Sequence, residues 1–265
     1  MIAGSVLVGL VVLAAVVSLF WTPFDPVQAM PADRLQGSSA EHLMGTDKFG
    51  RDTFSAILAG AQITLLVGVV AVLIALVVGT PLGILAGMRR GAVEEATMRF
   101  ADVLLAFPAL LVAIVFSAVF GASTMTAMVA IGIGSVPGFA RVARSGTLQV
   151  MSTEYVQAAR ASSQPALRIA RRHVLPNIAG MVVVQCSVTF GLAVLAEAAL
   201  SFLGLGTPPP IPSWGRMLQT SQEFWGTEPM LAVWPGLAIA VAVMGFNLLG
   251  DALRDRFDPK LNGER

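Results

Sequence analysis

The chain has 265 residues and a formal net charge of +1; 55% of its residues are hydrophobic and only 12% are charged. An average soluble domain carries roughly a quarter charged residues, so this composition excludes an ordinary soluble protein and indicates a polytopic membrane protein. The basic residues are scattered between apolar blocks and form no continuous stripe, which argues against a nucleic-acid partner.

Apolar runs long enough for a helix to cross the hydrocarbon core predict an all-α protein with six transmembrane helices. The third and fourth runs share one charge-free stretch that is too long for a single crossing and is broken near residues 121–124. Kinks are expected at Pro81, Pro108 and Pro137. The whole chain, residues 1–265, is expected to be one transmembrane domain, with spans at residues 2–21, 63–87, 103–120, 125–140, 177–199 and 229–250.

The distribution of basic residues predicts the orientation of these spans, because cytoplasmic loops carry an excess of Lys and Arg. If both termini are cytoplasmic, all Lys and Arg residues are cytoplasmic except Arg34, Lys48, Arg51 and Arg216. Segments 22–62 and 200–228 are then external loops, and residues 141–176 form a cytoplasmic loop. A polar, ordered loop of this length in so apolar a chain indicates a soluble partner.

Local signals predict two short helices within residues 141–176. Ser152 or Thr153 can cap a helix whose first turn holds Glu154. Pro165 disfavours α-helical geometry at the residue before it and suits the start of a second helix, which is expected to end near Pro176. Small residues after Glu154 permit close approach to a partner surface or to another part of the same protein.

Several motifs of this chain resemble those of one family of transport proteins. The stretch EYVQAARA at residues 154–161, followed by LRI at 167–169 and RHVLPN at 172–177, resembles the EAA loop of bacterial ABC-importer permeases. Within that family, the chain most resembles the second permease subunit of the dipeptide/oligopeptide/nickel group. The further stretches that agree are HLMGTDKFGRD at 42–52, EAALSFLGLG at 197–206, PSWG at 212–215, FNLLGD at 246–251 and LRD at 253–255.

The resemblance implies a type I ABC-importer permease in the bacterial plasma membrane, surrounded by membrane lipid and paired with a homologous permease. Two ABC ATPase subunits or one fused ATPase would hold ATP and Mg²⁺, and an external binding protein would deliver di- or oligopeptides. No GxxxxGK[ST] sequence occurs here, so ATP hydrolysis is expected in the partner subunits. This chain itself is expected to have no enzyme activity and to bind no cofactor or metal. The residues implied to couple it to the ATPase are Glu154, Tyr155, Gln157, Ala158, Ala159, Arg160, Ser163, Leu175 and Pro176.

The chain departs from the family motif at two of these positions. Gln157 replaces the motif's own Glu, which removes a charge but keeps hydrogen-bonding ability. Ser163 stands where the family usually has Gly, which would supply a helix-ending positive φ that costs other residues on the order of 1 kcal/mol. Docking is still expected, with Glu154 as an acidic contact.

Other ionisable residues leave alternatives open. Glu197, near the external end of the fifth span, is a candidate for the substrate path, although a structural role is also open. Asp102 is expected to pair locally with Arg99. His42 and its acidic neighbours match no metal motif, and a structural loop is favoured there. The alternative functions are import of nickel or another small solute by the same architecture, an ion-coupled secondary transporter or channel, and a scaffold or assembly protein with no transport path.

Overall fold

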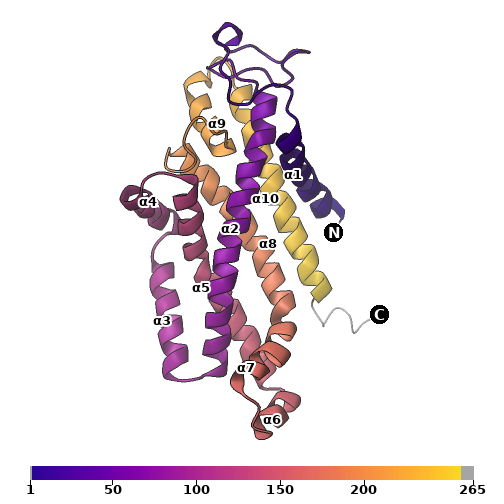
Figure 1. Cartoon of the computed structure of the whole chain (residues 1–265), viewed down its shortest axis with the longest axis vertical. Helices are drawn as coiled ribbons and strands as arrows, with labels where there is room; N and C mark the ends of the chain where they lie inside the picture. The colour runs from indigo at the N-terminus through magenta and orange to yellow at the C-terminus, as the bar shows by residue number, and fades with distance from the viewer. Residues whose placement is uncertain (1, 258–265) are drawn as a thin grey trace.

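The computed structural model describes residues 2–257, and the regular elements among them are helices, as the sequence predicts. Its helices form an elongated bundle (Figure 1). Short helical turns lie at Pro31–Asp33, Ala170–Val174 and Gln222–Phe224. The α-helices in chain order are α1 (Ile2–Phe20), α2 (Thr53–Met88), α3 (Ala92–Ala106), α4 (Ala109–Phe120), α5 (Thr124–Met151), α6 (Glu154–Ala161), α7 (Ala166–Ile169), α8 (Leu175–Phe202), α9 (Trp214–Ser221) and α10 (Met230–Phe257).

Five of the predicted spans are continuous helices, and the third is a bent pair. Helices α3 and α4 together are long and apolar enough for one span, but their axes meet at 81°. Phe107 adopts an extended conformation at the break, as expected for a residue that precedes proline, and Pro108 has no N–H to continue the helix. Pro81 and Pro137, in contrast, lie inside α2 and α5 without ending either helix.

Several helices extend beyond the predicted spans because polar residues continue them past the apolar runs. Helix α2 begins at Thr53 rather than at residue 63, since Asp52 caps it: its Oδ2 accepts hydrogen bonds from the backbone N–H and the Oγ of Ser55, both at 2.7 Å. Helix α5 continues to Met151, well past the predicted end at residue 140. The segment 200–228, predicted as a loop, contains the end of α8 and all of α9.

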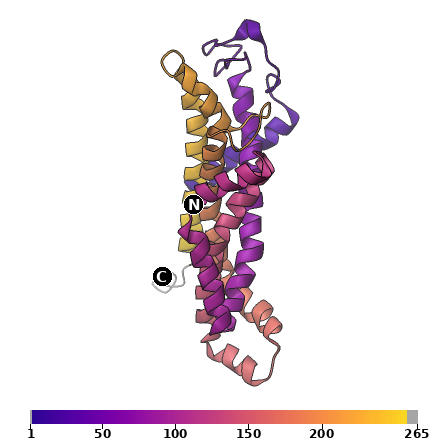
Figure 2. The same cartoon turned by 90° about the vertical axis from the view of Figure 1, so that its left-hand side faces the viewer.

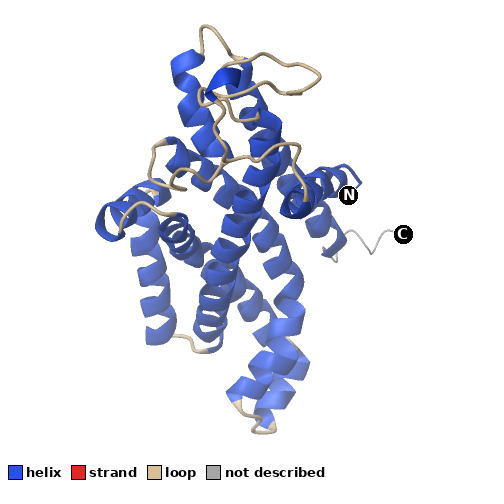
Figure 3. Ribbon diagram, turned by 45° about the horizontal axis from the view of Figure 1, so that its top comes forward, coloured by secondary structure: helices blue, strands red, loops and turns tan. Residues whose placement is uncertain are grey.

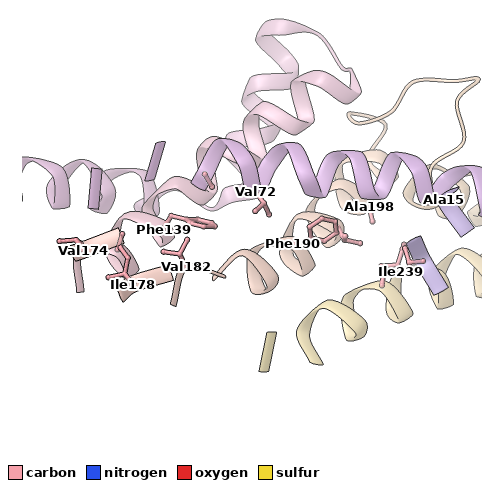
Figure 4. Packing of buried hydrophobic residues seen from close by; sticks show 14 of the residues in the cluster. Ala15, Val72, Phe139, Val174, Ile178, Val182, Phe190, Ala198 and Ile239 are labelled. Carbon is pink, nitrogen blue, oxygen red and sulfur yellow. The ribbon is translucent and has the colours of Figure 1, made fainter. Parts of the chain in front are cut away.

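Helices α2 and α5 approach closely because one face of α2 carries glycine at four-residue intervals, at positions 79, 83 and 87. A Cβ atom added to Gly79 would lie 2.6 Å from the carbonyl oxygen of Val136, and one at Gly83 would overlap the carbonyl oxygen of Ala140. Backbones can pack this tightly only where small residues face each other. The core beside this contact joins α2, α5 and α8 through residues such as Val72, Phe139 and Val182 (Figure 4).

Ion pairs fasten α3 to α5 on the side of the bundle away from α1. The guanidinium group of Arg141 donates a 2.6 Å hydrogen bond to Asp102, and Arg144 pairs with Glu94. Asp102 therefore has a structural role, but its partner is Arg141 and not the nearby Arg99, which pairs with Glu95. Both arginines of α5 were predicted to lie in the loop at 141–176 and instead belong to the helix.

The predicted external loops and the predicted coupling loop lie at opposite ends of the bundle. The loop of residues 21–52 and helix α9 occupy one end, and α6 and α7 project beyond the other (Figures 1 and 2). With the first end tilted toward the viewer, tan loops are seen to connect the helices there (Figure 3). There His42 Nδ1 lies 3.0 Å from Asp52 Oδ1, and both side chains are buried. His42 thus ties the loop to the capping residue of α2, which supports its structural interpretation.

Candidate functional site

Helix α6 begins at Glu154, as predicted, but neither predicted hydroxyl caps it. Thr153 occupies the capping position, yet its Oγ1 donates a 2.7 Å hydrogen bond to the carbonyl oxygen of Val150. Ser152 Oγ donates in the same way to Gln149. The hydroxyl groups therefore satisfy the last carbonyl groups of α5, which also lack helical partners. The prediction identified the start of the helix correctly and the hydrogen bonds wrongly.

Ser163 adopts the positive φ that the family's glycine would supply. Its φ is 54°, its N–H donates to Arg160 O at 2.9 Å, and the N–H of Gln164 donates to Ala159 O at 3.2 Å. These two bonds are those of a Schellman motif, which ends a helix at a residue in the left-handed conformation. The bend between α6 and α7 is therefore built by Ser163 and Pro165 together.

Substitution of Ser163 by glycine is expected to stabilise the end of α6 by about 1 kcal/mol, because glycine adopts a positive φ without the steric cost. The backbone N–H of Gln164 should then exchange its hydrogen more slowly in the purified protein. Ser162→Gly is the matched control: Ser162 has a φ of −77°, so glycine there should accelerate exchange. Equal effects of the two variants would contradict this account.

The second predicted helix does not end near Pro176. Helix α7 continues through the turn at Ala170–Val174 into α8, which gives one continuous helix from Ala166 to Phe202. The turn is a π-helix in which Leu175 N–H donates to the carbonyl oxygen of Ala170, and this wider turn accommodates the proline ring. The Nδ2 group of Asn177 donates a 2.6 Å hydrogen bond to His173 O. The loop predicted at 141–176 is consequently much shorter.

One face of α6 packs against the protein and the other is exposed. Val156 and Ala159 are buried, with relative exposures of 0% and 7%, so Ala159, which the resemblance implied as a coupling residue, packs against the protein's own chain. Gln157 is exposed, and its Nε2 donates to Ser152 O at 3.2 Å. Along the α6 to α8 segment, the other predicted coupling residues are all exposed: Glu154, Tyr155, Ala158, Arg160, Ser163, Leu175 and Pro176.

A cavity of about 480 Å³ lies among α3, α4, α5 and α8. Its walls are mostly apolar, but Ser135 of α5 and Gln185 and Thr189 of α8 contribute polar groups. Gln185 Nε2 donates a 3.1 Å hydrogen bond to Thr189 Oγ1. We did not identify these residues from the sequence, although an amide side chain inside the apolar run at 177–199 was a usable signal.

Glu197 is buried inside its own chain, with a relative exposure of 1%. Ser201 Oγ donates a 2.6 Å hydrogen bond to the carboxylate of Glu197. The same Oγ accepts a 3.0 Å hydrogen bond from the backbone N–H of Thr207. The carboxylate thus holds the chain that leaves α8 and leads to α9. It lies apart from the polar groups of the α5–α8 cavity, and its role in a substrate path stays a prediction.

Replacing Glu197 by alanine is expected to destabilise the protein by roughly 1–3 kcal/mol, because it removes a buried hydrogen-bond acceptor and leaves a void. Thermal unfolding of the purified protein should show a lower midpoint. Glu41→Ala, at an exposed position of the loop at residues 21–52, is the control and should leave the midpoint unchanged. If both variants unfold like the unmodified protein, Glu197 does not organise this turn.

The profile of a family described as binding-protein-dependent transport system inner membrane component matches residues 79–263. The chain belongs to this family. The match covers α3 to α10 and includes the exposed face of α6 and the α5–α8 cavity. The family description establishes that the chain is a multi-pass transport component of the inner membrane.

Named members of this family are similar to the chain over nearly its whole length. The dipeptide transport system permease protein DppC of Alkalihalophilus pseudofirmus is 42% identical over 260 residues, which cover 98% of this chain and 86% of that protein. The glutathione transport system permease protein GsiD of Pectobacterium atrosepticum is 42% identical over 262 residues, 97% of this chain and 87% of that protein. The resemblance to the dipeptide/oligopeptide/nickel group is therefore confirmed.

Solved structures of ABC transporters share the fold. A chain of the inward-facing MetNI methionine ABC transporter superposes with a TM-score of 0.64 at 18% identity and covers 77% of this chain and 96% of its own. A chain of an amino acid ABC transporter gives a TM-score of 0.54 at 16% identity, with 76% and 94% covered. This likeness confirms the type I ABC-importer permease architecture.

Proposed function

We propose that this member of the family is one of two permease subunits of an ATP-driven importer of di- or oligopeptides. The two relatives are named for transport of dipeptides and of glutathione, and both are short peptides. An external binding protein would deliver the peptide, and a homologous permease would complete the path. The proposed orientation places both termini and α6 in the cytoplasm.

The exposed face of α6 is the observation that carries the coupling part of this proposal. Glu154, Tyr155, Gln157 and Ala158 are exposed, while Val156 and Ala159 hold the helix on the bundle. A short, anchored helix whose free side carries acidic, aromatic and amide side chains around the small Ala158 can enter a groove of a partner. Two ABC ATPases or one fused ATPase would provide that groove and would hold ATP and Mg²⁺.

The continuous helix from Ala166 to Phe202 connects the coupling face with the α5–α8 cavity. Gln185 lies nineteen positions after Ala166, which corresponds to roughly 30 Å along a helix that rises ~1.5 Å per residue. A displacement of α6 that is transmitted through the bend at Ser163 and Pro165 would move this helix and with it one wall of the cavity. Ser135, Gln185 and Thr189 offer donors and acceptors suited to the amide groups of a peptide.

Reconstitution tests the proposal. The chain should copurify with a homologous permease and an ATPase, and proteoliposomes of the complex should take up a labelled dipeptide only with ATP and the binding protein. Gln185→Leu should reduce this uptake without releasing the ATPase. Uptake by the chain alone, driven by an ion gradient, would overturn the proposal in favour of a secondary transporter. Uptake of Ni²⁺ in place of the peptide would overturn the proposed substrate only.

A further inference from the structure

A second cavity, of about 800 Å³, separates the lower half of α2 from the α6 to α8 segment. Its α2 wall includes Leu76, Ile84 and Met88, which are spaced by multiples of four residues and therefore share one face of the helix. The facing wall includes Leu167 and Leu175, which are exposed in the isolated chain at 68% and 44%. The cavity is a long apolar trough that runs parallel to α2.

Three arginines, Arg89, Arg160 and Arg171, line this trough. Arg89 directly follows α2, and the guanidinium group of Arg160 donates to Met88 O at 3.4 Å, so the charges of Arg89 and Arg160 gather at the same end. None of the residues that line the trough is acidic. Within residues 2–257, none of the three arginines forms an ion pair. The trough therefore has an apolar length and a cationic end.

Gln164 adds an unpaired polar group to this trough. Its Oε1 atom is buried and has no hydrogen-bond partner within the described part of the chain, and its side chain lines the same trough as Arg160. A buried acceptor without a partner costs free energy unless a donor fills the site. A ligand with hydroxyl groups beside an anionic group would satisfy Gln164 and the arginines together.

We propose that this trough binds an anionic phospholipid of the cytoplasmic leaflet, with its phosphate at the end that holds Arg89 and Arg160 and an acyl chain along α2. Basic pockets at the cytoplasmic ends of spans attract anionic headgroups. The thirteen positions from Leu76 to Arg89 correspond to about 20 Å of helix, which exceeds the roughly 15 Å of one hydrocarbon leaflet. The headgroup of one lipid thus fits the charged end of the trough, and its acyl chain fits the apolar length.

This inference rests on the proposed orientation, which places Arg89 and α6 on the cytoplasmic side. The trough itself is too apolar for a soluble phosphate to use its full length, and its walls match an acyl chain better than a polar peptide. A lipid held between α2 and the segment that follows α6 would also contact the helix that carries the proposed coupling movement. The occupancy of the trough would then affect how α6 and α8 move together.

Native mass spectrometry of the delipidated importer complex, without ATP or peptide, tests the proposal. Phosphatidylglycerol should bind at low micromolar concentration, while phosphatidylcholine with the same acyl chains and soluble glycerol phosphate should not. The double variant Arg89→Gln, Arg171→Gln should bind phosphatidylglycerol roughly tenfold or more weakly, since each basic residue near a membrane surface contributes about a factor of five. Arg90→Gln is the matched control, because Arg90 is exposed next to Arg89 and does not line the trough.

A phosphatidylglycerol that carries a photoreactive acyl chain gives an independent readout. Its crosslinks should map to the α2 segment from Leu76 to Met88, and Ile84→Trp should suppress them by filling the apolar length. Equal lipid binding by the double variant and the unmodified complex would overturn the proposal. So would crosslinks confined to the other permease, which would show that a protein surface covers this trough. Neither result bears on peptide uptake, so the transport proposal is tested separately.

Discussion

Replacing Ala158 by tryptophan is expected to release the ATPase from the importer and to abolish ATP-dependent peptide uptake. Ala158 lies on the exposed face of α6, and an indole ring there would hold the partner groove away from the helix. A misfitted side chain at the centre of an interface costs about 2 kcal/mol or more, which corresponds to at least a tenfold loss of association. The measurement is the amount of ATPase that copurifies with the permease pair.

Ala92→Trp is the matched control for this substitution. Ala92 is an exposed alanine at the start of α3, at the same end of the bundle but outside α6 and α7 (Figure 1). This variant should still copurify with the ATPase and should support ATP-dependent peptide uptake. Ala159→Trp is a poor test, because Ala159 is buried and the ring would unfold the loop itself. If Ala158→Trp copurifies with a full complement of ATPase, α6 is not the docking helix.

Much of the α6 site could be predicted from the sequence because its signals are local. A hydroxyl residue before Glu154 indicated where the helix begins. The family's glycine at the position of Ser163 indicated a helix end there, and the structure shows that serine itself adopts the positive φ. The side that α6 buries could not be predicted in the same way. Ala158 and Ala159 are chemically identical neighbours, and only the packing of α6 on the bundle distinguishes the exposed residue from the buried one.

The differences between the helix ends and the predicted spans have a common physical origin. Apolar runs indicate where a helix meets lipid, but a helix ends only where its backbone hydrogen bonds end. Asp52 and the polar residues up to Met151 continue α2 and α5 beyond their apolar cores. Pro176 was taken as a stop, yet a π turn and the side chain of Asn177 satisfy the carbonyl groups around it. Proline does interrupt the helix at Pro108, where the preceding residue, Phe107, is extended.

Gly83→Ala is expected to destabilise the permease by about 1–3 kcal/mol, the usual cost of overpacking, although alanine favours helices by about 1 kcal/mol over glycine. A Cβ atom at this position would overlap the carbonyl oxygen of Ala140 and lie 2.7 Å from the Cβ of Ala143. The α2 and α5 backbones would have to separate. Thermal unfolding of the purified complex should show a clearly lower midpoint, and less protein should accumulate in membranes.

Gly236→Ala separates this packing effect from the effect of helix propensity. Gly236 also lies inside a long apolar helix, α10, but a Cβ added there meets no atom within 4 Å. Both substitutions add the same methyl group and the same gain in helix propensity, so a difference in unfolding midpoint measures the α2–α5 contact alone.

Helix α2 also lines the apolar trough, and α5 lines the α5–α8 cavity. A rigid α2–α5 contact would keep both walls fixed while α8 moves, so Gly83→Ala should lower peptide uptake by more than the loss of folded protein explains.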